Sequence, residues 1–209
     1  VLRQLAALKP GTRVVILATV PISQMGEALR VAGILSERLT VVLRTGVPSN
    51  RDELNRVGVH RASGIIILSN PRDDSNAIKT LVLLASRTDW SHPSVSLTAE
   101  IGLEQNYELA ELGARDRLQV VSSSRVTSKM IVQTIRNPGL ARIYDELMAT
   151  EGNSFCVQDV EAAAGTTFEE LAYGFAGAVP VGISWTESRG NTTLHKAALN
   201  PEPDYDLDE

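Results

Sequence analysis

Acidic residues follow two apolar segments of this 209-residue chain, at points where strands of a parallel sheet would end. Asp73 and Asp74 come after the apolar run 64–69, and Glu100 follows the run 94–99. The carboxyl ends of neighbouring parallel strands border the crevice in which open α/β sheets bind ligands. Carboxylate oxygens suit a hard cation such as Ca²⁺, which takes further oxygens from carbonyls, water or a second subunit. The pattern therefore indicates a Ca²⁺ site that involves Asp73, Asp74 and Glu100.

The two aspartates also have a second interpretation. A helix is expected to begin near residue 73, and acids in the first turn of a helix interact favourably with its dipole and its free amides. On this interpretation Asp73 and Asp74 stabilise a helix and bind no ion. Both interpretations are consistent with the sequence.

Residue patterns of several enzyme classes are missing from the sequence. A dinucleotide site needs G-x-G-x-x-G after the first strand and an acid at the end of the second. Here the first turn reads TVPISQMGEALRVAG, and Arg44 stands near where the acid would be. His60, His92 and His195 have no metal-ligand spacing, and no G-x-S-x-G motif occurs. The chain therefore supports neither a nucleotide site nor catalysis of its own.

Short β-branched apolar runs alternate with helical stretches from residue 13 to residue 121, which is typical of βα units around a parallel sheet. The runs are almost continuously apolar, so both faces of the sheet should be covered. The sequence predicts an α/β fold with a Rossmann-like doubly wound sheet. The predicted strands are 13–18, 39–44, 64–69, 94–99 and 117–122. The predicted helices are 23–35, 51–57, 73–86, 103–112 and 124–136, the last capped by the serines at 122–124.

Composition limits the partners of the chain. The net charge is −5 and the 20 Lys and Arg residues are scattered, so there is no basic stripe for nucleic acid. Cys156 is the single cysteine, which excludes a disulfide framework and favours a reducing compartment. No run approaches the roughly 18 apolar residues of a membrane span. The chain taken alone is therefore predicted to be soluble.

The pattern changes after Leu147. We expect a linker near 149–153 and then a small α+β lobe. In this lobe EGNSFCVQDVEAAAGTTFEELAYGFAGAVPVGISW indicates a strand, a loop, a short helix around 167–174 and another strand at about 180–185. The last part of the sequence is polar and has a weak pattern. The predicted organisation is a Rossmann-like subdomain at 1–123, crossover helices at 124–150 and a C-terminal lobe at 151–209.

Several longer stretches resemble a known family. GVPSNRDELNRVGVHRASGIIILSNPRDDSNA and ELAELGARDRLQVVSSS resemble the RCK domain, the regulator of K⁺ conductance. RNPGLARIYDELMATEGNSFCVQDV and TTFEELAYGFAGAVPVGISW are similar to the cytosolic domain of Castor and Pollux type ion channels. The resemblance covers nearly the whole chain. It implies a non-enzymatic gating-ring domain of a ligand-regulated K⁺ or Ca²⁺ channel, on the cytoplasmic face and joined to a transmembrane pore of the same polypeptide.

The resemblance also implies a homo-oligomer, a dimer of RCK units within a tetrameric ring. Helices 124–136 and 138–148 would contact the partner subunit, and Asn137-Pro138-Gly139 would form the turn between them. The first of these helices carries more apolar positions than one core-facing stripe needs, as expected of a helix packed on two sides. The implied interface residues are Val126, Met130, Ile131, Ile135, Leu140 and Ile143.

Calcium-gated RCK channels use an aspartate in the acidic loop and glutamates after the next strand. Asp74 and Glu100 match these positions, whereas Gly102 stands where a second glutamate would fall. In the family, the first strand of the sheet would precede VLRQLAALKPGT, and a final strand would come near PDYDLDE. Two alternatives are a soluble nucleotide-sensing subunit of a K⁺ transporter and, less well supported, a Rossmann-type oxidoreductase.

Overall fold

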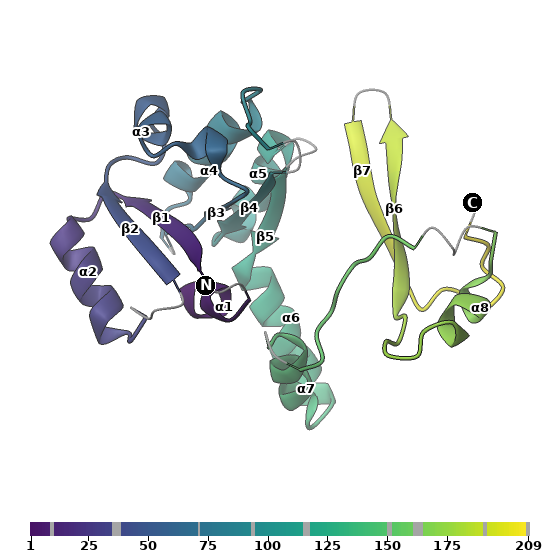
Figure 1. The fold of residues 1–209 in the computed structure, drawn as a ribbon. Coiled ribbons are helices and arrows are strands. Elements are labelled where there is room, and N and C mark those ends of the chain that lie inside the picture. Colours follow the sequence, from purple (N-terminus) through teal and green to yellow (C-terminus); the bar gives the residue numbers. More distant parts are fainter. Residues whose placement is uncertain are drawn as a thin grey trace. The chain divides into compact units, whose positions relative to one another are not determined.

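The chain folds into two compact units, Val1–Ser154 and Phe155–Glu209. Each unit is described separately below. The computed structural model describes residues 1–8, 11–34, 39–70, 72–92, 95–114, 118–149, 152–160, 165–189 and 192–207 (Figure 1).

The strands of the first unit form two parallel sheets. β1 (Thr12–Ala18) pairs with β2 (Leu39–Thr45) along its whole length. β4 (Ser96–Ile101) lies between β3 (Gly64–Ile67) and β5 (Leu118–Ser122) in the other sheet. Parallel strands joined through helices confirm the predicted α/β class and the Rossmann-like alternation.

Helices alternate with these strands. Their bounds are α1 (Leu2–Leu8), α2 (Ile22–Val31), α3 (Arg51–Arg56), η1 (Val59–Arg61), α4 (Ser75–Ala85), η2 (Glu104–Asn106), α5 (Tyr107–Ala114), α6 (Ser123–Arg136) and α7 (Leu140–Leu147). Asn50 accepts hydrogen bonds from the amides of Asp52 and Glu53 and caps α3, while Gly58 follows the helix with a left-handed φ of 69°. α2 ends at Val31, earlier than predicted, because Gly33 adopts a φ of 64° just beyond it.

The core of the first unit lies between α4, α5 and the three-stranded sheet (Figure 1). Leu81 and Leu84 of α4 are fully buried, and so are Ala99 and Ile101 of β4. The remaining core residues come from the neighbouring strands and helices, and Leu17 of β1 packs against them. This core fixes the carboxyl ends of β3, β4 and β5, where the predicted ligand residues lie.

The second unit contains α8 (Phe168–Tyr173) and an antiparallel hairpin of β6 (Gly182–Arg189) and β7 (Thr192–Leu199). Thr167 and Glu170 form a capping box at the start of α8, which explains why this short helix forms at the predicted place. Two predictions for this unit are wrong. Residues 154–160 form no strand, and β7 lies in a segment for which no strand was predicted.

Candidate functional site

Asp74 lies at the start of α4, and its side chain is fully buried. Its carboxylate accepts hydrogen bonds from the amides of Gly102 (3.0 Å) and Leu103 (2.9 Å) and from the Asn106 side chain (3.1 Å). Burial alone would raise the pKa of Asp74, but these donors, together with Ser69, outweigh it and hold the pKa below its ordinary value. Asp74 therefore stays ionised and ties the first turn of α4 to the chain that leaves β4.

Asp73, although adjacent, has a different environment. Its carboxylate is exposed and accepts a hydrogen bond from the Ser75 amide at 2.9 Å. The hydrogen bonds from Ser75 lower the pKa of Asp73. This is the arrangement that the capping interpretation predicts for an acid at a helix start.

Glu100, the third predicted ligand, lines a cleft of about 340 Å³ at the ends of β3 and β4. The other lining residues are Ser69, Gly102, Ser123, Ser124, Thr127 and Ser128, all but Gly102 with a hydroxyl group. Gly102 connects the cleft to Asp74, because its amide donates to that carboxylate. Asp73 is not among the lining residues. Across the described part of the chain, no three His, Cys, Asp or Glu side chains gather as metal ligands would.

The first turn of α6 forms one wall of this cleft and is firmly anchored. Ser122 caps the helix by accepting from the Arg125 amide at 3.2 Å, which confirms the predicted serine cap. The Arg125 guanidinium donates from Nε to Glu104 Oε1 at 2.9 Å and stacks over the Tyr107 ring at 4.1 Å. The same hydrogen bond from Arg125 lowers the pKa of Glu104. No sequence pattern indicates this anchor, because Glu104, Tyr107 and Arg125 are separated along the chain.

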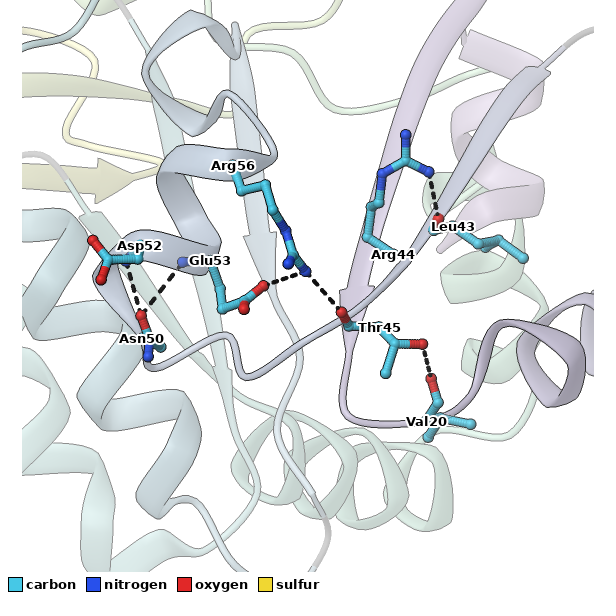
Figure 2. Close-up of polar contacts among 8 residues, drawn as sticks. All are labelled: Val20, Leu43, Arg44, Thr45, Asn50, Asp52, Glu53 and Arg56. Atoms are coloured by element: carbon cyan, nitrogen blue, oxygen red, sulfur yellow. Dashed lines mark hydrogen bonds and ion pairs between the residues drawn. The ribbon is translucent and has the colours of Figure 1, made fainter.

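A second strand end, that of β2, is shown in Figure 2. Arg56 forms an ion pair with Glu53 and donates to the Thr45 carbonyl at 3.1 Å. Arg44 donates to the Leu43 carbonyl at 2.9 Å. A ribose hydroxyl in a dinucleotide site is bound by an acid near such a strand end, whereas the acid here, Glu53, pairs with an arginine.

The predicted interface residues gather on α6 and α7. Neither helix has a buried residue, and four of the predicted residues expose between 41% and 76% of their surface: Val126, Ile131, Ile135 and Ile143. Met130 and Leu140 are half-buried. The two helices enclose a groove of about 500 Å³ lined by Thr127, Met130, Ile131, Thr134, Ile135, Ala141, Tyr144 and Asp145. This surface is called the α6–α7 groove below.

The helices of the described residues are all too short or too polar to cross a bilayer. Residues 124–209, which include the α6–α7 groove and the second unit, match the family model described as Castor and Pollux, part of voltage-gated ion channel. The chain is thus similar to ion channels. The resemblance of its motifs to Castor and Pollux type channels is confirmed.

Individual relatives extend the similarity across most of the chain. The ion channel CASTOR of Lotus japonicus is 27% identical over 174 residues, which cover 81% of this chain and 20% of that protein. The probable ion channel POLLUX of Arabidopsis thaliana is 26% identical over 175 residues, which cover 81% of this chain and 20% of that protein. The chain therefore spans about a fifth of the length of these relatives. The crystal structure of the GsuK RCK domain matches with a TM-score of 0.39 and 21% identity, over 93% of this chain and 42% of that one.

Proposed function

We propose that this chain is a regulatory domain of a cation channel similar to Castor and Pollux, on the cytoplasmic face of the membrane, with no catalysis of its own. The observation that carries the proposal is the match of residues 124–209 to this channel family. These residues begin with the helices whose apolar side chains are exposed in the single chain. The transmembrane pore would belong to the same polypeptide, as expected from the greater length of the relatives.

The α6–α7 groove supports a homo-oligomer. Ile131 and Ile135 line the groove and expose 55% and 76% of their surface. Ile143 of α7 is not a lining residue, but it exposes a further 53% on the same pair of helices. Contiguous exposed apolar side chains rimmed by polar residues are typical of protein–protein contact surfaces. A second copy would present the same helices, so a two-fold arrangement would cover both grooves at once. Pairs of such domains would then assemble into the tetrameric gating ring of the channel.

Ligand regulation would act through α6. Thr127 lines both the strand-end cleft and the α6–α7 groove, so one rigid helix borders the ligand cleft and the proposed subunit contact. A ligand that binds one arrangement of the ring more tightly shifts the population towards it. Moving a two-state ring from mostly closed to mostly open takes a roughly 10⁴-fold difference in affinity, about 5.5 kcal/mol, which several subunits would share.

Ca²⁺ is the ligand that we propose for the cleft, where Glu100 supplies a carboxylate among hydroxyl groups. Calorimetric titration of the chain with Ca²⁺ in the presence of Mg²⁺ should show saturable binding. Glu100→Gln should abolish the binding, whereas Asp73→Asn should retain it because Asp73 lies outside the cleft wall. An absence of binding heat at two temperatures in the wild type would exclude Ca²⁺ as the ligand.

The oligomer is tested by Ile131→Asp, which places a charge in the α6–α7 groove. Size-exclusion chromatography with light scattering should show dimers for the wild type and monomers for the variant. Leu112→Asp is the matched control, because Leu112 is 82% exposed on α5 and lies outside the groove. If Ile131→Asp assembles as the wild type does, the groove is not the contact surface. In the full channel, the same variant should lose ligand-dependent opening while its pore still conducts.

A further inference from the structure

A polar segment after β4 connects the buried aspartate to the first turn of α6. Residues 102–106 hold the Asp74 carboxylate through two backbone amides and the Asn106 side chain. The same segment contains Glu104, whose side chain contacts Arg125 of α6. Helix α6 itself has no buried residue. Because Asp74 fixes the segment from one side, the position of α6 depends on what Glu104 contacts on the other.

Each oxygen of the Glu104 carboxylate has a different partner. Oε1 accepts from Nε of Arg125 at 2.9 Å and also from its Nη2. Oε2 accepts from the Ser122 hydroxyl at 3.2 Å, and this hydroxyl lies 3.2 Å from that of Ser124. Ser124 is part of the wall of the strand-end cleft. A chain of hydrogen bonds therefore runs from the cleft wall through Ser122 to the carboxylate that holds α6.

The contact between Arg125 and Glu104 is exposed enough to exchange partners. The two side chains expose 39% and 56% of their surface. Ion pairs open to solvent contribute little net stability, because water competes for both charges. Nε and Nη2 reach the same carboxylate oxygen, so the pair lacks the two parallel bonds of a bidentate contact. The contact therefore sets the position of α6 without locking it.

A second carboxylate lies close to the Arg125 guanidinium. The guanidinium stacks over the Tyr107 ring at 4.1 Å. A hydrogen bond to Glu111, one turn further along α5, raises the pKa of Tyr107. Glu104 raises the pKa of Arg125, and the charge of Glu111 adds to this effect. Arg125 thus has an alternative anion on the far side of the ring on which it stacks.

We propose that the contact of Arg125 with Glu104 is a latch, which Ca²⁺ in the cleft opens. The cation would draw the Glu104 carboxylate towards the cleft, Arg125 would move to Glu111, and α6 would turn with it. Two discrete partners for one guanidinium give the helix two positions. Thr127 lines both the cleft and the α6–α7 groove, so the turn of α6 reaches the proposed subunit contact. The latch rests on the proposed function, because its cation is the ligand proposed for the cleft.

The distance between two spin labels measures the position of α6 without any ligand. The labels would be attached through Arg51→Cys on α3 and Arg136→Cys at the end of α6, with Cys156→Ser removing the native thiol. Dilution with unlabelled chain leaves only distances within one molecule. Glu104→Gln should move the distance distribution to a second maximum, the one that Ca²⁺ produces in the wild type. Glu104→Gln combined with Glu111→Gln should broaden it, because both partners of the guanidinium are then neutral.

Calorimetric titration with Ca²⁺ tests whether the latch competes with the cation. Arg125→Gln should tighten binding about 10-fold, as expected if the latched wild type is competent to bind about one tenth of the time. Glu104→Gln should weaken binding. Lys129→Gln is the matched control, because Lys129 lies on the same helix and its charge also acts on Glu104. It should tighten binding by less than about 2-fold, because salt screens exposed charges.

Two results would overturn the latch. One is a label distance that neither Glu104→Gln nor Ca²⁺ changes. The other is an Arg125→Gln variant that binds Ca²⁺ no more tightly than Lys129→Gln does. If the wild type binds no Ca²⁺ while Glu104→Gln still shifts the label distance, the proposed ligand is wrong and the two positions of α6 are supported.

Discussion

Helices α4 and α6 both carry apolar side chains along their length, yet α4 buries several of them and α6 buries none. Leu81 and Leu84 of α4 expose none of their surface, because α5 and the three-stranded sheet cover this helix. Ile131 and Ile135 of α6 expose more than half of theirs. α6 is held chiefly at its first turn, where Ser122 and Arg125 make their contacts. An apolar helix surface therefore indicates the need for a partner, and the rest of the fold decides whether that partner lies in the same chain.

The largest loss of stability should come from shortening a buried side chain of α4. Leu84→Ala should lower the free energy of unfolding by about 2–5 kcal/mol, the usual range for a fully buried leucine that leaves a cavity. Ile135→Ala should change it by less than about 0.5 kcal/mol at protein concentrations where the chain is monomeric. Urea denaturation followed by circular dichroism measures both. Similar losses for the two variants would show that α6 is covered within the single chain.

A smaller loss of unfolding free energy is expected from Asp74→Asn, which replaces a carboxylate that accepts several hydrogen bonds. The oxygen of the asparagine amide would still accept from one of the two backbone N–H groups of Gly102 and Leu103. Its NH2 group would face the other donor, at a cost of about 1.5–3 kcal/mol. Asp73→Asn is the matched control and should cost far less, because Asp73 is exposed. Equal costs for the two variants would contradict the assignment of Asp74 as the buried tie between α4 and β4.

The hydrogen bonds of Asp74 also predict that the free energy of unfolding depends on pH. The pKa of Asp74 is lower in the folded chain than its ordinary value, so its contribution to stability is complete above that ordinary value. The contribution is lost as the pH falls through the folded pKa. The difference in unfolding free energy between wild type and Asp74→Asn should therefore be constant near neutral pH and narrow in acid. If the difference between the two proteins widens in acid, the pKa of Asp74 is raised and not lowered by folding.

The smallest effect concerns the one firmly held end of α6. Ser122→Ala removes the side chain that accepts from the Arg125 amide and should cost about 1 kcal/mol. Ser128→Ala, an exposed position within the same helix, is the control and should be close to neutral. Thermal unfolding would compare the two variants. A neutral Ser122→Ala would mean that the contact of Arg125 with Glu104 is sufficient to hold the helix.

Much of the first unit could be predicted from the sequence because its strands are long apolar runs and its helices have clear ends. Asn50 and Gly58, residue types typical of helix ends, stand on either side of α3. The second unit was harder to predict. Phe155 and Val157 resemble strand residues, but they are 62% and 85% exposed and pair with nothing in the described chain. β7 was missed because hairpin pairing with β6, more than its own apolar pattern, makes it a strand.

The candidate site shows a different limit of sequence reasoning. The order of the strands brought Asp74 near the end of β4, as parallel topology predicts. The groups that meet its carboxylate include the backbone amides of Gly102 and Leu103, and every residue other than proline has such an amide. The sequence could therefore indicate where Asp74 lies but not what it binds there. A buried structural acid and a metal ligand share the same sequence pattern.

The exposed stretch 154–159 has a practical consequence. It joins the two units, and it contains Cys156, the one cysteine of the sequence. A thiol-reactive fluorophore would therefore attach at a single position, at the junction of the units and away from the cleft and the α6–α7 groove in sequence. Energy transfer from either tryptophan-bearing unit to this dye would report rearrangement during a titration without any engineered cysteine.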